Sequence, residues 1–89
     1  MNKSIEGNQQ VVVITGASGG IGKALVAFYQ KKDWFVVGID QTRPEVANFN
    51  IEFNQKFFRQ SHRVIEEIVD HGVSRIDALI NNAALQIFK

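Results

Sequence analysis

The residues of this sequence best suited to chemistry form the run Thr-Gly-Ala-Ser-Gly-Gly-Ile-Gly at positions 15–22. An apolar stretch, residues 11–14, precedes this run, and an amphipathic stretch, residues 23–32, follows it. That order predicts a buried strand, a glycine turn and a helix whose free N–H groups and positive dipole can hold a diphosphate. The glycines allow the tight turn and let the backbone approach the phosphates without a Cβ in the way. A turn that needs glycine for steric reasons alone is the alternative.

Asp40 is the second residue that indicates a ligand. It ends another apolar run, residues 34–39, which is typical of a buried strand. An acid at the tip of the second strand of such a unit can accept hydrogen bonds from both hydroxyls of an adenosine ribose. The carboxylate would also repel a 2′-phosphate, so it favours NAD over NADP. Gly19 agrees with NAD, because a basic residue there could have met the extra phosphate, whereas Arg43 argues for NADP. A solvated acid at a strand end is the alternative.

Residues 15–22 resemble the Thr-Gly-x-x-x-Gly-x-Gly loop of the short-chain dehydrogenase/reductase family. Residues 81–84, Asn-Asn-Ala-Ala, follow a predicted strand and resemble the family's Asn-Asn-Ala-Gly element, with Ala84 where a glycine is usual. The resemblance covers residues 11–85 and implies the amino-terminal, cofactor-binding half of the family's Rossmann fold. Methyltransferases place a glycine loop and an acid in a similar fold, but paired asparagines after the fourth strand are not their signature.

This resemblance also implies a set of cofactor-binding residues. The family's adenine-binding aspartate could align with any of residues 52–55, and we choose Asn54, whose amide oxygen could accept a hydrogen bond from the adenine amino group. A plain asparagine at a strand end is the alternative. Ser18 is expected to bond a phosphate or to cap the helix. The expected cofactor-binding residues are Gly16, Ser18, Gly19, Gly20, Ile21, Gly22, Asp40, Asn54, Asn81, Ala83 and Ala84.

The family's catalytic serine and Tyr-x-x-x-Lys pair have no counterpart in this sequence. Its single tyrosine, Tyr29, lies in the first predicted helix, and Asp33 rather than lysine stands four positions later. We therefore assign no catalytic residue and expect residues 11–89 to form a truncated dinucleotide-binding domain, preceded by a flexible lead, residues 1–10. NAD binding by such a fragment is expected to be weak or absent, because the nicotinamide end of the site would come from the missing half.

Two classes of function stay open. The chain could be the NAD(H)-binding amino-terminal part of an oxidoreductase, not expected to catalyse on its own. The alternative is a non-catalytic remnant that oligomerises or senses a nucleotide.

Composition indicates one small domain. A hydrophobic content of 45% can build one core, although a small one relative to its surface. Ten basic and nine acidic side chains leave a formal charge of +1, so nothing directs the chain toward nucleic acid or an acidic membrane. The absence of cysteine excludes disulfides and thiolate metal sites and is compatible with the cytoplasm. The two histidines, His62 and His71, have no cluster of acids or cysteines that would place both at one metal, so no metal site is expected.

The remaining patterns predict an α/β fold. Residues 49–53 alternate like a half-buried strand, residues 55 or 56 to 70 form a second helix, and residues 76–80 form a fourth strand. Right-handed crossovers then order four parallel strands 3-2-1-4 with helices on both faces, a partial Rossmann fold with the ligand at the carboxyl ends of strands one and four. The fourth strand is left as an open edge and part of the sheet stays uncovered, which predicts a homo-oligomer formed through the uncovered sheet face or the edge. The apolar residues at helical spacing are Ile21, Leu25, Phe28 and Tyr29 in the first helix, and Phe57, Ser61, Val64, Ile65 and Ile68 on the buried face of the second.

Overall fold

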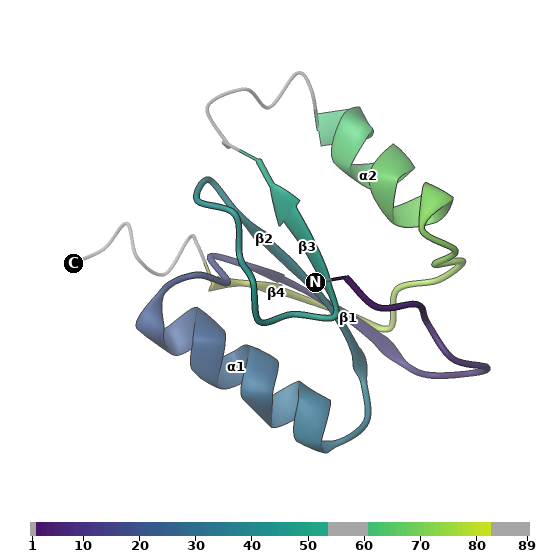
Figure 1. Cartoon of the computed structure of the whole chain (residues 1–89), viewed down its shortest axis with the longest axis horizontal. Helices are drawn as coiled ribbons and strands as arrows, with labels where there is room; N and C mark the ends of the chain where they lie inside the picture. The colour runs from purple at the N-terminus through teal and green to yellow at the C-terminus, as the bar shows by residue number, and fades with distance from the viewer. Residues whose placement is uncertain (1, 54–60, 83–89) are drawn as a thin grey trace.

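The computed structural model describes residues 2–53 and 61–82 of the chain. Its four strands are all parallel and lie in the order β3-β2-β1-β4, with one helix on each face of the sheet (Figure 1). The predicted fold, a partial Rossmann fold with strand order 3-2-1-4, is therefore confirmed. The elements are β1 (Val11–Thr15), α1 (Gly20–Lys31), β2 (Phe35–Asp40), β3 (Phe49–Glu52), α2 (Ser61–Asp70) and β4 (Ala78–Asn81).

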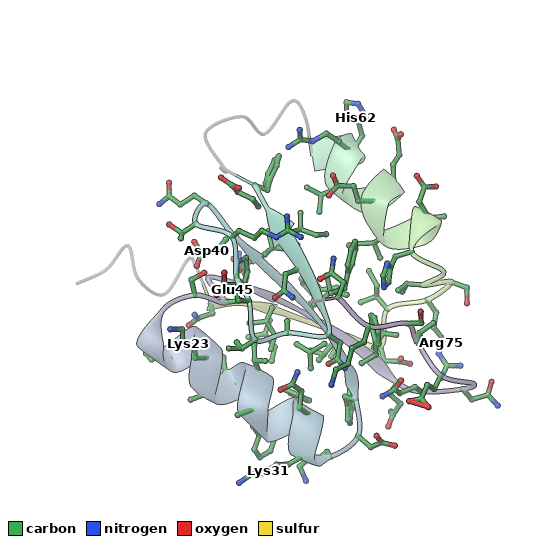
Figure 2. The ribbon with its side chains drawn as sticks, in the orientation of Figure 1. Lys23, Lys31, Asp40, Glu45, His62 and Arg75 are labelled. Carbon is green, nitrogen blue, oxygen red and sulfur yellow. The ribbon has the colours of Figure 1, made fainter. Side chains whose placement is uncertain are left out.

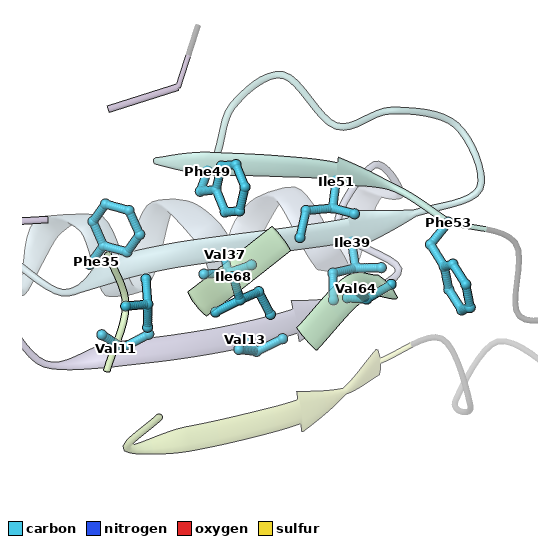
Figure 3. Close-up of a cluster of buried hydrophobic side chains, with 11 residues drawn as sticks. Val11, Val13, Phe35, Val37, Ile39, Phe49, Ile51, Phe53, Val64 and Ile68 are labelled. Carbon is cyan, nitrogen blue, oxygen red and sulfur yellow. The ribbon is translucent and has the colours of Figure 1, made fainter. Parts of the chain in front are cut away.

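Two hydrophobic layers hold the sheet between the helices. Because successive side chains of a strand point to opposite faces, the odd-numbered residues Val11 and Val13 of β1 face α2, and Val12 and Ile14 face α1. Figure 3 shows the layer on the α2 side, where side chains from three strands meet Val64 and Ile68 of α2. This double burial explains why the two central strands are continuous runs of apolar residues.

The side of α1 that packs against the sheet differs from the side predicted from its apolar residues. Val26 and Gly22 are buried, Leu25 and Tyr29 are half-buried, and Ile21 and Phe28 are exposed. The expectation that Ile21 and Phe28 belong to the buried face was wrong. The helix packs through residues four apart, Gly22 and Val26, because the glycine lets the first turn approach the sheet closely.

The helix α2 agrees better with its predicted face. Val64 and Ile68 are buried as expected, but Ile65 is 62% exposed, so its inclusion in that face was wrong. The predicted start at residue 55 or 56 and the side chains of Phe57 and Ser61 lie outside the described residues. The predicted end at Asp70 is confirmed, and Gly72 follows with φ +96° in the left-handed conformation that commonly terminates helices.

The strand β4 is an edge of the described sheet. It pairs with β1, and Asp77 just before it accepts a hydrogen bond from the backbone N–H of Val11 (2.7 Å). Leu79 is 67% exposed and Ile76 is also exposed. The strand runs from residue 78 to 81 rather than from 76 to 80. The Asp77 N–H donates to the carbonyl of Val11 (2.8 Å), but the Val11 N–H bonds to the Asp77 side chain, so the paired residues begin at Val12 and Ala78.

Residues 2–10 form no helix or strand, but Ile5 among them packs against the hydrophobic layer on the α2 side. The expectation that this segment is flexible stays a prediction.

The contribution of the buried layer to stability can be tested by replacing one buried and one exposed valine with alanine. Val37 of β2 is fully buried and Val69 of α2 is 59% exposed. We expect Val37→Ala to lower the free energy of unfolding by about 2 kcal/mol, because two buried methyl groups are lost and a cavity is left. Val69→Ala should change it by less than about 0.5 kcal/mol. Urea unfolding followed by circular dichroism measures both, and equal effects would contradict the assignment of this layer as the core.

Candidate functional site

The glycine loop between β1 and α1 is a tight turn held from two sides. Gly16 has φ +67°, a conformation that side chains other than glycine rarely adopt. Its carbonyl oxygen accepts hydrogen bonds from the backbone N–H of Gly19 (3.3 Å) and from the side-chain Nδ2 of Asn82 (3.1 Å). The turn is therefore tied to the end of β4 as well as to the start of the helix.

Gly22 lets α1 sit directly against this turn. A Cβ at Gly22 would overlap the carbonyl oxygen of Gly16 and would lie 2.8 Å from the Cα of Ala17, both of them backbone atoms that cannot move aside. By contrast, a Cβ at Gly20 would meet nothing within 4 Å. The two glycines therefore differ in role. Gly22 allows α1 to pack against the backbone of residues 16 and 17, whereas the space beside Gly20 is open.

The amino-terminal turn of α1 is suited to an anion. Gly19 is the N-cap residue and has no side chain, and no acidic residue lies in the first turn. The N–H groups of Gly20, Ile21 and Gly22 precede the first intrahelical hydrogen bond, which runs from Lys23 N–H to the carbonyl of Gly19 (2.8 Å). Such N–H groups, together with the helix dipole, favour negative charge.

Asp40 stands beside the loop at the carboxyl end of β2. Its half-buried carboxylate accepts the backbone N–H of Ser18 (3.0 Å) with one oxygen and that of Gln41 (2.8 Å) with the other. The Ser18 hydroxyl donates to the carbonyl of Thr42 (2.8 Å), which ties the loop to the chain after β2 a second time. Each carboxylate oxygen can accept a further hydrogen bond, so Asp40 keeps the capacity to bind two hydroxyl groups.

A hollow of about 380 Å³ opens between the loop and the connection from β2 to β3. The connection lies close on the sheet, because a Cβ at Gly38 would come within 2.9 Å of the Ala47 Cβ. Figure 2 shows Lys23, Asp40 and Glu45 at this end of the molecule. The hollow is lined by Ala17, Ser18, Lys23, Thr42, Arg43, Pro44, Glu45 and Val46.

Two of these lining residues, Lys23 and Arg43, carry positive charge, and neither was among the predicted cofactor-binding residues. A lysine one turn after the N-cap glycine, as Lys23 is, lies close enough to the loop to reach a ligand there. Arg43 had been noted as a nearby cation.

A pair of asparagines, Asn81 and Asn82, lies at the carboxyl end of β4, on the same side of the sheet as the glycine loop. Asn81 accepts a hydrogen bond from the Thr15 hydroxyl (2.9 Å), and the neighbouring Asn82 is fully buried. The Nδ2 of Asn82 holds Gly16, and its Oδ1 has no hydrogen-bond partner among the described residues. Sequence reasoning named Asn82 only as part of the Asn-Asn-Ala-Ala element and missed this role, because its partner Gly16 lies 66 residues away in the chain.

The described part of the predicted site therefore lies at the carboxyl ends of the strands. The structure brings together Gly16, Ser18, Gly19, Gly20, Ile21, Gly22, Asp40 and Asn81. Asn54, Ala83 and Ala84 lie outside the described residues. That any of these residues binds a cofactor stays a prediction.

Other sites receive less support. Residues 2–53 and 61–82 contain no group of three or more potential metal ligands. The ring of Tyr29 packs edge-on against Phe28 and Trp34 near the end of α1, so it has a packing role. Neither helix of the described segments is long and apolar enough to cross a membrane.

Comparisons with known proteins agree with this geometry. Residues 10–89 match the family described as short chain dehydrogenase. An uncharacterized oxidoreductase of Schizosaccharomyces pombe is 36% identical over 85 residues, which covers 92% of this chain and 32% of that protein. A probable 2,4-dienoyl-CoA reductase of Bacillus subtilis is 30% identical over 88 residues, which covers 85% of this chain and 34% of that protein. An uncharacterized short-chain type dehydrogenase/reductase of Sinorhizobium fredii is 30% identical over 84 residues, which covers 85% of this chain and 15% of that protein.

This chain belongs to the short-chain dehydrogenase family. It spans about a third of the length of the first two of these relatives, and less of the third. The predicted family resemblance is confirmed, and so is the correspondence of the chain with the amino-terminal part of the family fold.

The different roles of the two glycines can be tested by giving each a methyl group. Gly22→Ala should lower the free energy of unfolding by about 1–3 kcal/mol, because the new Cβ collides with backbone that must then shift. Gly20→Ala should leave stability unchanged or raise it slightly, because alanine favours the helix and the space is open. Thermal unfolding of both variants provides the measurement. Equal melting temperatures would show that α1 can move away from Gly16 without cost.

Proposed function

We propose that this chain is the NAD(H)-binding amino-terminal part of an oxidoreductase of the short-chain dehydrogenase family. The observation that carries the proposal is the link between Asp40 and Ser18, which joins an acid at the end of β2 to a glycine loop at a helix N-terminus. These are the two groups that a dinucleotide requires, since the loop binds its diphosphate and the acid binds its adenosine ribose. The names of the three relatives, all described as oxidoreductases or reductases, support the reaction class.

The diphosphate would lie over the amino-terminal turn of α1. The N–H groups of Gly20, Ile21 and Gly22 would donate to its oxygens, and the open space at Gly20 would let them approach. Lys23, one of the residues that line the adjoining hollow, would add positive charge on the same side. Gly16 and Asn82 act indirectly in this proposal, because they hold the loop in the shape that exposes those N–H groups.

The adenosine ribose would lie against Asp40, and we propose that NAD is preferred over NADP. The carboxylate already accepts two backbone N–H groups and would accept the 2′- and 3′-hydroxyls with its remaining lone pairs. A 2′-phosphate would meet the negative charge of Asp40, but also the positive charge of Arg43 in the adjoining hollow. The preference for NAD therefore depends on Asp40 being the closer of the two groups to the ribose.

Hydride exchange is the chemistry that the nicotinamide supplies when bound, and the residues described here contribute binding and orientation. We propose that the chain does not catalyse on its own, because the sequence contains no Tyr-x-x-x-Lys pair and Tyr29 has a packing role.

Nucleotide selection by Asp40 can be tested by titration calorimetry with NAD and NADP. Asp40→Ala should weaken NAD binding by about 1.5–3 kcal/mol, the value of hydrogen bonds to a charged group, and should narrow the advantage of NAD over NADP. Asp40→Asn keeps an oxygen for Ser18 N–H and removes the charge, so it should preserve the loop and improve the relative affinity for NADP.

Glu45→Gln is the matched control, since it removes a negative charge from the same hollow without touching Ser18. It should leave the ratio of the two affinities nearly unchanged. Equal affinities for NAD and NADP in the unaltered chain would refute the role of Asp40. Binding of neither nucleotide would favour a remnant without a ligand.

No strand in the described part of the chain pairs with the outer side of β4, which favours a second role for this chain, self-association. Leu79 is 67% exposed on this edge strand, and the strand offers backbone N–H and C=O groups along its outer side. Exposed strand edges with apolar side chains pair readily with other chains. We propose that a second copy of the chain covers this edge, which would make the protein a homo-oligomer.

A charge on β4 should prevent this association. Leu79→Lys places a lysine on the edge, where such residues discourage strand pairing, and should increase the monomer fraction in sedimentation velocity at micromolar concentration. Val46→Lys, a similar change at another exposed apolar residue, should leave the association unchanged. A well-folded monomer in the unaltered chain would contradict the proposal.

A further inference from the structure

The opposite edge of the sheet, β3, is partly covered by residues 2–10. The N–H of Phe53 donates to the carbonyl of Asp40 at the end of β2, so odd-numbered residues of this segment direct their backbone groups toward β2. Even-numbered residues direct theirs away from the sheet. The N–H of Asn50 accordingly meets the side-chain oxygen of Asn2 (2.8 Å), and the carbonyl of Asn48 meets the N–H of Lys3 (2.6 Å).

The Asn2–Asn50 contact is a close one. The Oδ1 of Asn2 also accepts the side-chain Nδ2 of Asn50 (3.1 Å), so one oxygen satisfies two donors of a residue that is only 5% exposed. A buried donor that loses its partner is costly. These two hydrogen bonds from Asn50 therefore fix the position of Asn2 beside β3.

His71, at the end of α2, holds the same segment from the other side. Its Nε2–H donates to the carbonyl of Lys3 (2.5 Å), and its ring stacks on Phe49 of β3 with centroids 4.0 Å apart and an interplanar angle of 8°. Ile5 then packs into the hydrophobic layer below. Residues 2–5 therefore lie between the β3 edge and the end of α2.

The segment is also tied down before it enters β1. The Arg75 guanidinium donates to the carbonyl of Asn8 (3.2 Å), and the side chain of Gln9 donates to the carbonyl of Asp33 (3.0 Å). Figure 1 shows this segment, in dark purple, running from beside β3 past the loop that leaves α2 and back into β1. Both ends are thus anchored on different parts of the fold.

Beyond Asn2, no residue in the described ranges bonds to the outer side of β3. The N–H of Glu52, like that of Asn50, points away from β2, and it has no hydrogen-bond partner among the described residues. A hollow of about 460 Å³ lies here, lined by Asn50, Glu52, Arg63 and Glu67 among others. The edge therefore has room for an extended chain, and the covered part is the part that residues 2–3 occupy.

We propose that residues 2–10 act as a strap that closes the β3 edge against strand addition, and that a second copy of this chain pairs with this edge when the strap is removed. Unpaired edge backbone is a template for another strand, and covering it with the chain's own segment is one way to prevent such pairing. This inference goes beyond the proposed cofactor site and does not depend on it.

Amide hydrogen exchange in the full chain tests the anchoring of the strap. Asn2→Ala should speed the exchange of the Asn50 amide by about tenfold or more, because the lost acceptor is worth that factor for a buried donor. Asn8→Ala is the matched control, since its backbone carbonyl still meets Arg75 and the same side chain is removed. Unchanged protection of Asn50 in Asn2→Ala would overturn the proposal.

A chain that lacks residues 2–9 tests the consequence, in a background that carries Leu79→Lys so that β4 is blocked. Sedimentation velocity should show more self-association than in the same background with the strap present. Adding Glu52→Pro, which removes an outward N–H without touching the bonds to β2, should restore the monomer. A folded monomer without the strap, or association that Glu52→Pro does not reduce, would overturn the proposal. Should the shortened chain fail to fold, Asn2→Ala in the Leu79→Lys background tests the same consequence, since it frees the Asn50 N–H and should increase self-association. An unchanged monomer fraction in that variant would overturn the proposal.

Discussion

The helix α1 can approach the end of β1 closely only because Gly22 has no side chain. With a Cβ at this position the helix would collide with the carbonyl of Gly16, and it would have to tilt or move away from the turn. The N–H groups of its first turn would then move too, since they are fixed to the helix axis. The close contact between two backbone segments is therefore what sets both the packing of α1 on the sheet and the position of the candidate anion site.

Asp40 has a structural role that precedes any ligand. By accepting Ser18 N–H, its carboxylate joins the loop after β1 to the end of β2, while Asn82 joins the same loop to the end of β4. The glycine loop, which has no side chains of its own to anchor it at Gly16, Gly19 and Gly20, is thus held from neighbouring strands on both sides. A loop held in this way meets a ligand without first having to be ordered, which lowers the entropic cost of binding.

The features predicted correctly from the sequence are those that depend on short-range pattern. The continuous apolar runs of β1 and β2, the glycine turn between β1 and α1, and the strand order follow from local periodicity and the handedness of crossovers. The wrong expectations concern which side of a helix faces the sheet. Ile21 and Ile65 fit an apolar stripe in the sequence, yet both are exposed, because the buried side is set by close contacts such as that of Gly22. The role of Asn82 depends on a contact 66 residues away in the chain, which no local pattern contains.

The two edge strands of the described sheet, β3 and β4, differ in the residues that cover or flank them. The β3 edge is partly covered by the chain itself, because Asn2 accepts two hydrogen bonds from Asn50 and the carbonyl of Asn48 accepts one from Lys3. The β4 edge carries Leu79, whose exposed side chain gains most from apolar contact with another surface. A strand edge closed by polar side chains and a covering segment resists pairing, whereas one that presents an apolar side chain favours it. This distribution of side chains supports the proposed protective role of residues 2–10 at β3 and the proposed self-association at β4.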